Sequence, residues 1–405
     1  MSKVRFLCTT GVLAFLVALG SLTASAQQIK TVFVIAMENH NWTQPANQFT
    51  GPIQQIYGNP NAPFINSLVN GTAPNDISDQ VAYATAYHNV LFGTGAHIHP
   101  SEPNYLWAEA GTNFGIFNDA DPFPSNLQTT SAHLATLLTN AGKTWKSYQE
   151  DIDLTLAPPY PAKPAPTTNV PISSADWSVP LVSFSGFFTG PPTNFYNGSL
   201  QFNYAAKHNP MVFFTDANGG APANTAPSNP LSSHYAPLQQ LATDLANDNV
   251  ADYNWISPDQ YNDQHTALTG GYKGLTGDAA NIKQGDDFLS VVVPMIMASD
   301  AYKNHGVIVI WWDESESDGV PGDNADDDTH TIGEIVISDR AHPNVNGLPY
   351  ASPVVYTHSS DLKTWQDIFH AGLPGPGSPY LGDAASPGVN DLSDLFKPGV
   401  VPKKP

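Results

Sequence analysis

The sequence predicts an α/β fold in which a mainly parallel sheet lies between helices, as a three-layer α/β/α sandwich. Uninterrupted apolar runs at 31–37 and 307–312 lack polar alternation, which is typical of strands buried on both faces. Segments of helical character alternate with the expected strands, and this alternation favours right-handed crossovers between parallel strands. Polar side chains follow the apolar runs, as expected where a parallel sheet presents its carboxyl edge to a ligand.

Capping residues and helix breakers delimit the expected elements. Ser101 is placed to cap a helix, with an acidic residue and Pro103 in its first turn. Gly142 ends a second helix, and residues 70–100 form a long connection. We expect strands at 31–37, 143–148, 211–215, 251–257, 307–312 and 334–338, and helices at 64–69, 101–108, 132–140, 237–246, 285–300 and 361–370.

The chain of 405 residues divides into a leader, one large domain and a tail. Residues 1–26 contain basic residues, a short apolar run and a final Ala-Ser-Ala, which is the order of a secretory signal peptide. We therefore expect a secreted or periplasmic protein. The domain should span 27–396, with an insertion rich in proline and aromatic residues at about 157–203, and 397–405 should be a loose tail. The insertion either covers the site as a wall or lid or packs on the main core.

Charge and cysteine content narrow the function. Removing residues 1–26 changes the formal charge from −21 to −23, because this segment carries two basic and no acidic side chains. Such a surface repels nucleic acid and anionic membranes. Cys8 is the only cysteine and lies in the leader, so we expect neither disulfides nor thiolate metal sites.

Potential ligands and catalytic groups gather at the ends of the expected strands. Because a parallel sheet brings these ends to one edge, groups far apart in sequence can meet there. Oxygen donors favour Mg²⁺, Ca²⁺ or Mn²⁺, while the histidines leave Zn²⁺ among the candidate metals. For His97, His99 and His208 the alternatives are contact with phosphate oxygens and a solvated loop, and the solvated loop is the favoured interpretation. The groups that follow the strands are Glu38 and Asn39, the segment 259–265 with His265, Asp313 and Glu314, and finally His330 and His358.

Ser101 is the candidate nucleophile. A serine hydroxyl attacks poorly on its own, but a neighbouring metal lowers its pKa and a helix N-terminus favours an anion. Both conditions suit attack on a phosphoryl group. The alternative is that Ser101 serves only as a helix cap.

Seven segments, taken in order, resemble the bacterial phosphoesterase family of secreted acid phosphatases and phospholipase C enzymes, within the alkaline phosphatase-like superfamily. They are MENHNW at 37–42, HPSEPNYL at 99–106, AGKTWKSYQED at 141–151, KHNPMVFF at 207–214, SPDQYNDQH at 257–265, VIVIWWDES at 307–315 and THSSDLKTWQDIF at 357–369.

This resemblance implies an alkaline phosphatase-like sandwich and hydrolysis of a phosphate ester through a phosphoserine at Ser101. It implies a divalent metal ion (Ca, Mg, Mn or Zn) held by Glu38, Asn39, Asp313 and Glu314. His265, His330 and His358 fall on active-site histidines of the family. Many members have Asp-Asp where this chain has Asp313-Glu314, so the identity of the metal stays open.

The leading hypothesis is a secreted, metal-dependent phosphomonoesterase acting on a small phosphate ester, with no nucleic-acid partner. One alternative is a phospholipase C acting on lipid headgroups, for which the aromatic insertion would contact the membrane. Another is a secreted binding protein that has lost turnover. The leaving group, the number of metals, the pH optimum and the oligomeric state stay open.

Overall fold

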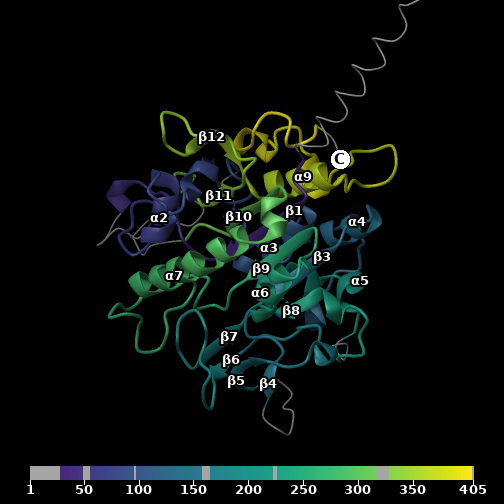
Figure 1. The fold of residues 1–405 in the computed structure, drawn as a ribbon. Coiled ribbons are helices and arrows are strands. Elements are labelled where there is room, and N and C mark those ends of the chain that lie inside the picture. The colour runs from purple at the N-terminus through teal and green to yellow at the C-terminus, as the bar shows by residue number, and fades with distance from the viewer. Residues whose placement is uncertain are drawn as a thin grey trace, which may run out of the picture.

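An eight-stranded sheet runs through the centre of the molecule (Figure 1). The computed structural model describes residues 28–48, 55–94, 97–156, 165–221, 226–316 and 328–403, so the expected signal peptide at 1–26 lies outside the described residues. The strand order is β12-β2-β11-β10-β1-β9-β3-β8. The strands are β1 (Thr31–Met37), β2 (Val81–Tyr87), β3 (Trp145–Gln149), β8 (Tyr235–Pro237), β9 (Tyr253–Ser257), β10 (Gly306–Trp312), β11 (Glu334–Ile337) and β12 (Tyr350–Tyr356).

The sheet is mainly parallel, as predicted, with β11 as its antiparallel member. β11 runs against both of its neighbours, β10 and β2, whereas β10, β1, β9, β3 and β8 pair in parallel. The carboxyl ends of the parallel strands therefore share one edge. Because β11 runs the other way, the residues that precede it lie at this same edge.

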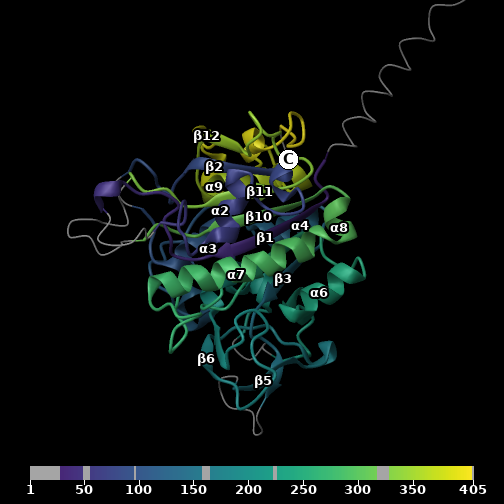
Figure 2. The ribbon, with the colours of Figure 1, turned by 60° about the vertical axis from the view of Figure 1, so that its left-hand side comes forward.

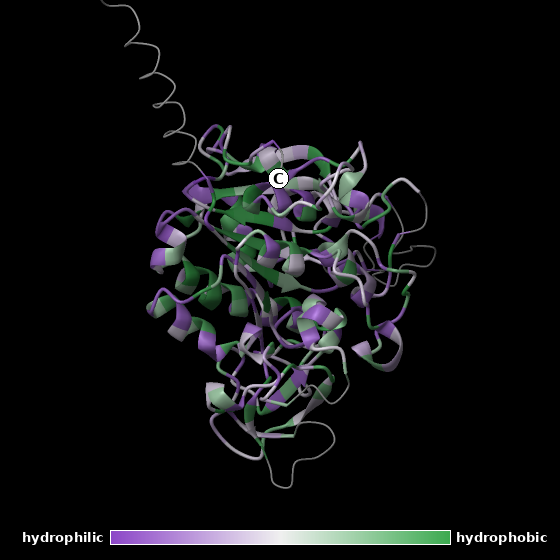
Figure 3. Ribbon diagram, turned by 90° about the vertical axis from the view of Figure 1, so that its right-hand side faces the viewer, coloured by the Kyte–Doolittle hydropathy of each residue, from purple (hydrophilic) through white to green (hydrophobic). Residues whose placement is uncertain are grey.

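The two central strands are buried along their length. β1 and β10 pair in register from Thr31 with Gly306 to Met37 with Trp312. Every residue of β10, and every residue of β1 after Thr31, is buried. Figure 3 shows hydrophobic strands at the centre of the molecule. The apolar runs at 31–37 and 307–312 thus form strands buried on both faces, as predicted.

Helices cover both faces of the sheet (Figure 2), which confirms the three-layer arrangement. On one face, the Trp311 ring packs against Tyr105 of α3 and His358 of α9. On the other, α7 approaches the sheet closely at Gly285, where an added Cβ would lie 2.8 Å from the Met37 methyl group. The helices are α2 (Pro63–Asn70), α3 (Ser101–Ala110), α4 (Leu134–Asn140), α5 (Thr215–Asn218), α6 (Gln239–Ala246), α7 (Asp278–Met297), α8 (Asp300–Lys303) and α9 (His358–Phe369).

Two small hairpins project from one end of the sheet in the region of the predicted insertion (Figure 1). β4 (Leu154–Leu156) pairs with β5 (Pro166–Pro171), and β6 (Phe184–Phe187) pairs with β7 (Gln201–Tyr204). Aromatic rings of the second hairpin pack on one another, with Phe184 and Phe202 centroids 6.0 Å apart. These rings belong to the same hydrophobic core as the central strands, so the insertion packs on the main core, which is one of the two predicted alternatives. Residues 157–164, at the start of the predicted insertion, lie outside the described residues.

Three local predictions were wrong. Residues 210–213 form a 3₁₀ helix instead of a strand, because Pro210 lacks the N–H that a sheet ladder needs. The expected connection at 70–100 contains β2, whose alternating alanines and tyrosines carry a weak strand signal. Ser101 is the first residue inside α3, after an N-cap at Pro100, and its side chain makes no capping hydrogen bond.

No helix among the described residues is both long and apolar enough to cross a bilayer.

Candidate functional site

Ser101 lies at the carboxyl edge of the sheet with its hydroxyl among charged groups. It is 1% exposed, and its Oγ donates a hydrogen bond to Glu38 Oε2 at 2.9 Å. Glu314 Oε1 is 3.4 Å away, and Lys207 Nζ donates to the same Oγ at 3.5 Å. The Ser101 hydroxyl, for which the sequence left open a nucleophile or a helix cap, therefore faces two carboxylates and an ammonium group.

Glu38 follows β1 directly and is completely buried. Its Oε1 accepts a hydrogen bond from the Tyr105 hydroxyl at 2.7 Å and lies 3.1 Å from His208 Nε2. Burial raises the pKa of Glu38 well above its ordinary value, the charge of Asp313 adds to this, and Lys207 acts in the opposite direction. The carboxylate is therefore held in place by several groups, but its negative charge is only partly compensated.

Asp313 and Glu314 follow β10 and lie beside Glu38, because Met37 pairs with Trp312 in the parallel ladder. The backbone N–H of Asn39 donates to Asp313 Oδ1 at 3.0 Å. Glu314 Oε2 accepts from Asn104 Nδ2 at 3.0 Å and lies 2.8 Å from His99 Nδ1. Burial raises the pKa of both carboxyl groups. The two strand ends thus concentrate three acidic side chains in one buried place.

The oxygens of this group are of the chemical kind that a divalent cation takes as ligands. The side-chain oxygen of Asn39 lies 3.3 Å from Glu38 Oε2 and 3.0 Å from Glu314 Oε1, so oxygen faces oxygen. The reverse orientation of the amide would place two N–H donors there instead. In either orientation Asp313 Oδ2 stays buried without a hydrogen-bond partner. Carboxylate and amide oxygens, one of them unsatisfied, are what Mg²⁺, Ca²⁺ or Mn²⁺ take as ligands.

Lys207 and His208 belong to the site, although they were not among its predicted residues. Lys207 Nζ donates to Asp119 Oδ2 at 3.0 Å. Burial opposes the charged form, but Glu38 and Asp119 raise the pKa of Lys207 above its ordinary value. His208 is 2% exposed, stacks on Tyr105 and lies 3.2 Å from Asp263 Oδ2, so its expected solvated position was wrong. Neither residue follows a predicted strand, so the signal used for the others missed both.

The three predicted catalytic histidines occupy different positions. His265 lies near the site, with its ring centroid 6.3 Å from that of His208, and burial together with Lys207 lowers its pKa to about 4. His330 precedes β11 and its Nε2 lies 2.7 Å from Gln48 Oε1. His358 is completely buried, donates from Nε2 to the Asp313 carbonyl and accepts from Trp311 Nε1 at 3.0 Å. His358 therefore holds the backbone at the end of β10 in place through the Asp313 carbonyl.

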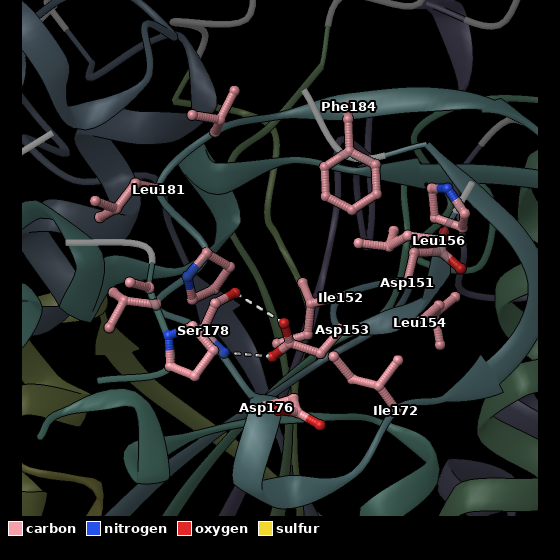
Figure 4. A pocket seen from close by; sticks show the side chains of 16 residues that line it. Asp151, Ile152, Asp153, Leu154, Leu156, Ile172, Asp176, Ser178, Leu181 and Phe184 are labelled. Atoms are coloured by element: carbon pink, nitrogen blue, oxygen red, sulfur yellow. Dashed lines mark hydrogen bonds between the residues drawn. The ribbon is translucent and has the colours of Figure 1, made fainter. Parts of the chain in front are cut away.

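A cavity of about 570 Å³ lies in the insertion, away from Ser101 (Figure 4). Its walls are mostly apolar, and Asp153 in its wall accepts hydrogen bonds from the backbone N–H and the hydroxyl of Ser178. Two further groups of potential metal ligands lie elsewhere in the described residues. They are His40 with Asp278 and Glu316, and Glu150 with Asp151 and Asp259.

Three curated proteins are similar to this chain. An acid phosphatase of Aspergillus fumigatus is 30% identical over 43% of this chain and 30% of its own length. A probable acid phosphatase of Kluyveromyces lactis is 24% identical over 55% of this chain and 39% of its own length. A phosphatidylinositol-3-phosphatase of Mycobacterium tuberculosis is 26% identical over 50% of this chain and 70% of its own length. The matches thus span well under half of either fungal protein.

Solved structures match over most of the chain at low identity. A protein of the alkaline phosphatase superfamily from Vibrio parahaemolyticus has a TM-score of 0.43 and 10% identity, covering 92% of this chain and 70% of its own. A sulfatase from Pseudoalteromonas sp. has a TM-score of 0.46 and 9% identity, covering 96% and 76%. The profile of one family matches residues 19–370 and confirms the resemblance drawn from the seven segments. The chain belongs to the Phosphoesterase family.

Proposed function

We propose that the protein is a secreted, metal-dependent phosphoesterase of the acid phosphatase type, which hydrolyses phosphomonoesters through a phosphoserine at Ser101. One observation carries this proposal. The Ser101 hydroxyl lies at the N-terminus of α3 between Glu38 and Glu314, with Lys207 Nζ 3.5 Å from its oxygen. An ammonium group and a helix N-terminus both favour a phosphoryl anion at this place.

The residues act on the substrate as follows. A bond forms between Ser101 Oγ and phosphorus while the bond from phosphorus to the leaving oxygen breaks, and the proton lost by the Ser101 hydroxyl balances the proton gained by the departing alcohol. The Lys207 ammonium stabilises negative charge on Oγ and on the phosphoryl oxygens. Attack by water on the phosphoserine then restores the Ser101 hydroxyl and releases inorganic phosphate.

Glu38, Asn39, Asp313 and Glu314 would hold the metal ion. When bound, such an ion polarises phosphoryl oxygens and lowers the pKa of a neighbouring hydroxyl. Tyr105 fixes the Glu38 carboxylate through its hydroxyl, at 2.7 Å. His358 fixes the Asp313 backbone through its carbonyl. Both contacts support ligands that must hold their geometry.

Charge favours a small substrate. A chain with a formal charge near −23 after removal of the leader repels an anionic bilayer or a polyphosphate at long range, whereas a small monoester is repelled less.

One observation favours the alternative function, a phospholipase C. Phe187 and Phe195 on the insertion are 62% and 73% exposed, as expected of side chains that contact lipid.

Three measurements test the proposal. Mass spectrometry of acid-quenched enzyme should find phosphate on the peptide that contains Ser101, and phosphate on another residue would contradict the mechanism. The kcat/KM values for 4-nitrophenyl phosphate, its phosphorylcholine analogue and phosphatidylcholine vesicles then separate the substrate classes. Faster release of diacylglycerol from vesicles than of phosphate from the monoester would establish the phospholipase. N-terminal sequencing of exported protein should start at Gln27.

A further inference from the structure

A second acidic group lies at the same edge of the sheet, at the ends of β3 and β9. Glu150 and Asp151 follow β3, and Asp259 follows β9, next to it in the sheet. The three side chains are 2%, 0% and 1% exposed. One ligand oxygen from each lies within 4.8 Å of the others. This group, Glu150, Asp151 and Asp259, is called the β3–β9 acidic group below.

The hydrogen bonds of the β3–β9 acidic group leave two oxygens unsatisfied. Glu150 accepts from the side-chain amides of Asn194 and Asn262 and from the backbone N–H of Asp259. Asp259 Oδ1 accepts two backbone N–H bonds, and Asp151 Oδ2 accepts one from Asn203. Asp151 Oδ1 and Asp259 Oδ2 are buried and have no hydrogen-bond partner.

Buried carboxylates need compensation that the described side chains do not supply. Among the described residues, no Lys, Arg or His forms an ion pair with Glu150, Asp151 or Asp259. Burial raises the pKa of all three groups, and the charge of Glu150 adds to the shift at Asp151 and Asp259. Two states would compensate the negative charge of this group. Either a proton is shared between the two aspartates, or a cation is bound.

We propose that the β3–β9 acidic group is a calcium site, separate from the metal site at Ser101. Ca²⁺ binds oxygens at about 2.4 Å, so two ligands on opposite sides of one ion are about 4.8 Å apart. The separations in this group lie within that limit. Three carboxylates without nitrogen or sulfur favour a hard cation over Zn²⁺. Mg²⁺ keeps several waters, for which a group buried to this extent leaves little room.

The calcium site would fix part of the catalytic centre. Asp259 begins the loop that carries Asp263 and His265, and the backbone N–H of Asp263 bonds to the Asp259 carbonyl. Asp263 Oδ2 in turn lies 3.2 Å from His208 Nδ1, beside Glu38. Asp151 also lines the cavity of the insertion, so the site joins the insertion to the sheet. An ion here would stabilise the protein and hold the loop without touching substrate.

Calcium content and thermal stability test the proposal. The protein is equilibrated with Ca²⁺, freed of loose ions and analysed by plasma mass spectrometry. Asp151→Asn and Asp259→Asn should each contain one calcium fewer than wild type, whereas Glu38→Gln should keep that calcium. Asp176→Asn, an exposed change in the same cavity wall, is the matched control and should keep it too. Added Ca²⁺ should raise the Tm of Glu38→Gln and leave the Tm of the double variant Glu38→Gln with Asp151→Asn unchanged, because the double variant lacks both sites.

A second measurement covers the case in which the aspartate variants do not fold. Calorimetric titration of chelator-treated Glu38→Gln with Ca²⁺ should show one binding site, and no binding would overturn the proposal. Equal calcium content in wild type and folded Asp151→Asn would also overturn it. A Tm of chelator-treated Glu38→Gln that does not respond to Ca²⁺ would overturn it as well and would assign the shared proton instead. None of these readouts depends on turnover, so they stand apart from the proposed phosphoesterase activity.

Discussion

Two buried acidic groups at one edge of the same sheet differ in what surrounds them. The group after β1 and β10 faces a hydroxyl and an ammonium group, those of Ser101 and Lys207. The group after β3 and β9 faces asparagine amides and backbone N–H donors. Under our two proposals, carboxylates at the ends of parallel strands support reaction in one place and structure in the other. A nucleophile and a cation beside the carboxylates make the difference.

The largest expected effect comes from removing the nucleophile. Ser101→Ala should lower kcat at least about 10³-fold, because no other described hydroxyl takes the place of the attacking oxygen. Stability should change by less than about 1 kcal/mol, since the Ser101 side chain caps no helix N–H. Steady-state kinetics and urea unfolding measure the two effects. Ser173→Ala, a change in the insertion, serves as control and should keep full activity. Normal turnover by Ser101→Ala would show that Ser101 is not the nucleophile, so the two acidic groups would no longer differ in this respect.

Removing a ligand carboxylate should have the next largest effect. Glu38→Gln and Asp313→Asn should each lose bound metal and more than about 100-fold in kcat/KM, because a ligand supplies both charge and position. Metal analysis and kinetics after dialysis against chelator check this. Asp300→Asn, whose side chain is 86% exposed, is the control for loss of one negative charge. If either ligand variant keeps wild-type activity in chelator, the metal site at Ser101 is wrong.

Removing the Lys207 ammonium group tests the second difference between the two acidic groups. Lys207→Met keeps the length of the side chain but leaves Glu38 and Asp119 without their ammonium partner. We expect kcat to fall about 100-fold, since a preorganised charge on the transition state contributes on that scale. Lys207→Arg should recover part of this loss because it restores the charge. A change confined to KM would show that Lys207 only binds substrate.

A third group, at His133, tests how a titrating cation stabilises the acidic side chains beside it. His133 lies 2.8 Å from both Glu109 Oε1 and Asp216 Oδ1. Burial alone would lower the pKa of His133, but these partners raise it to about 9. A raised folded-state pKa means that this stabilisation is complete below about pH 6.5, the unfolded value, and is lost as pH rises through about 9.

The free energy of unfolding should therefore fall between these pH values. The effect attributable to His133, on the order of 1 kcal/mol, is the difference between wild type and His133→Gln, in which other titrating groups cancel. Urea unfolding at pH 6 and pH 10, in chelator, measures it. An equal pH dependence in both proteins would show that His133 keeps one charge state throughout.

Much of the fold followed from the sequence because its signals are local. The runs at 31–37 and 307–312 became β1 and β10, since continuous apolar residues tolerate burial on both faces. The polar residues after them came to one edge because parallel strands end together. Those two facts were enough to predict Glu38, Asp313 and Glu314 as neighbours.

The sequence by itself determined β1, β3, β9, β10 and β11, most of the helices around the sheet, and the acidic residues that meet after β1 and β10, but it did not show β2, β8 and β12. Tertiary structure alone decided which further groups join those acidic residues. Lys207 and His208 reach Ser101 and Glu38 from a 3₁₀ helix that no periodic pattern marks. The Ser101 hydroxyl turns from its own helix toward a carboxylate 63 residues away. The physical reason is range: a strand or helix is encoded by adjacent side chains, whereas the pairing of a charge with its partner depends on how distant segments pack.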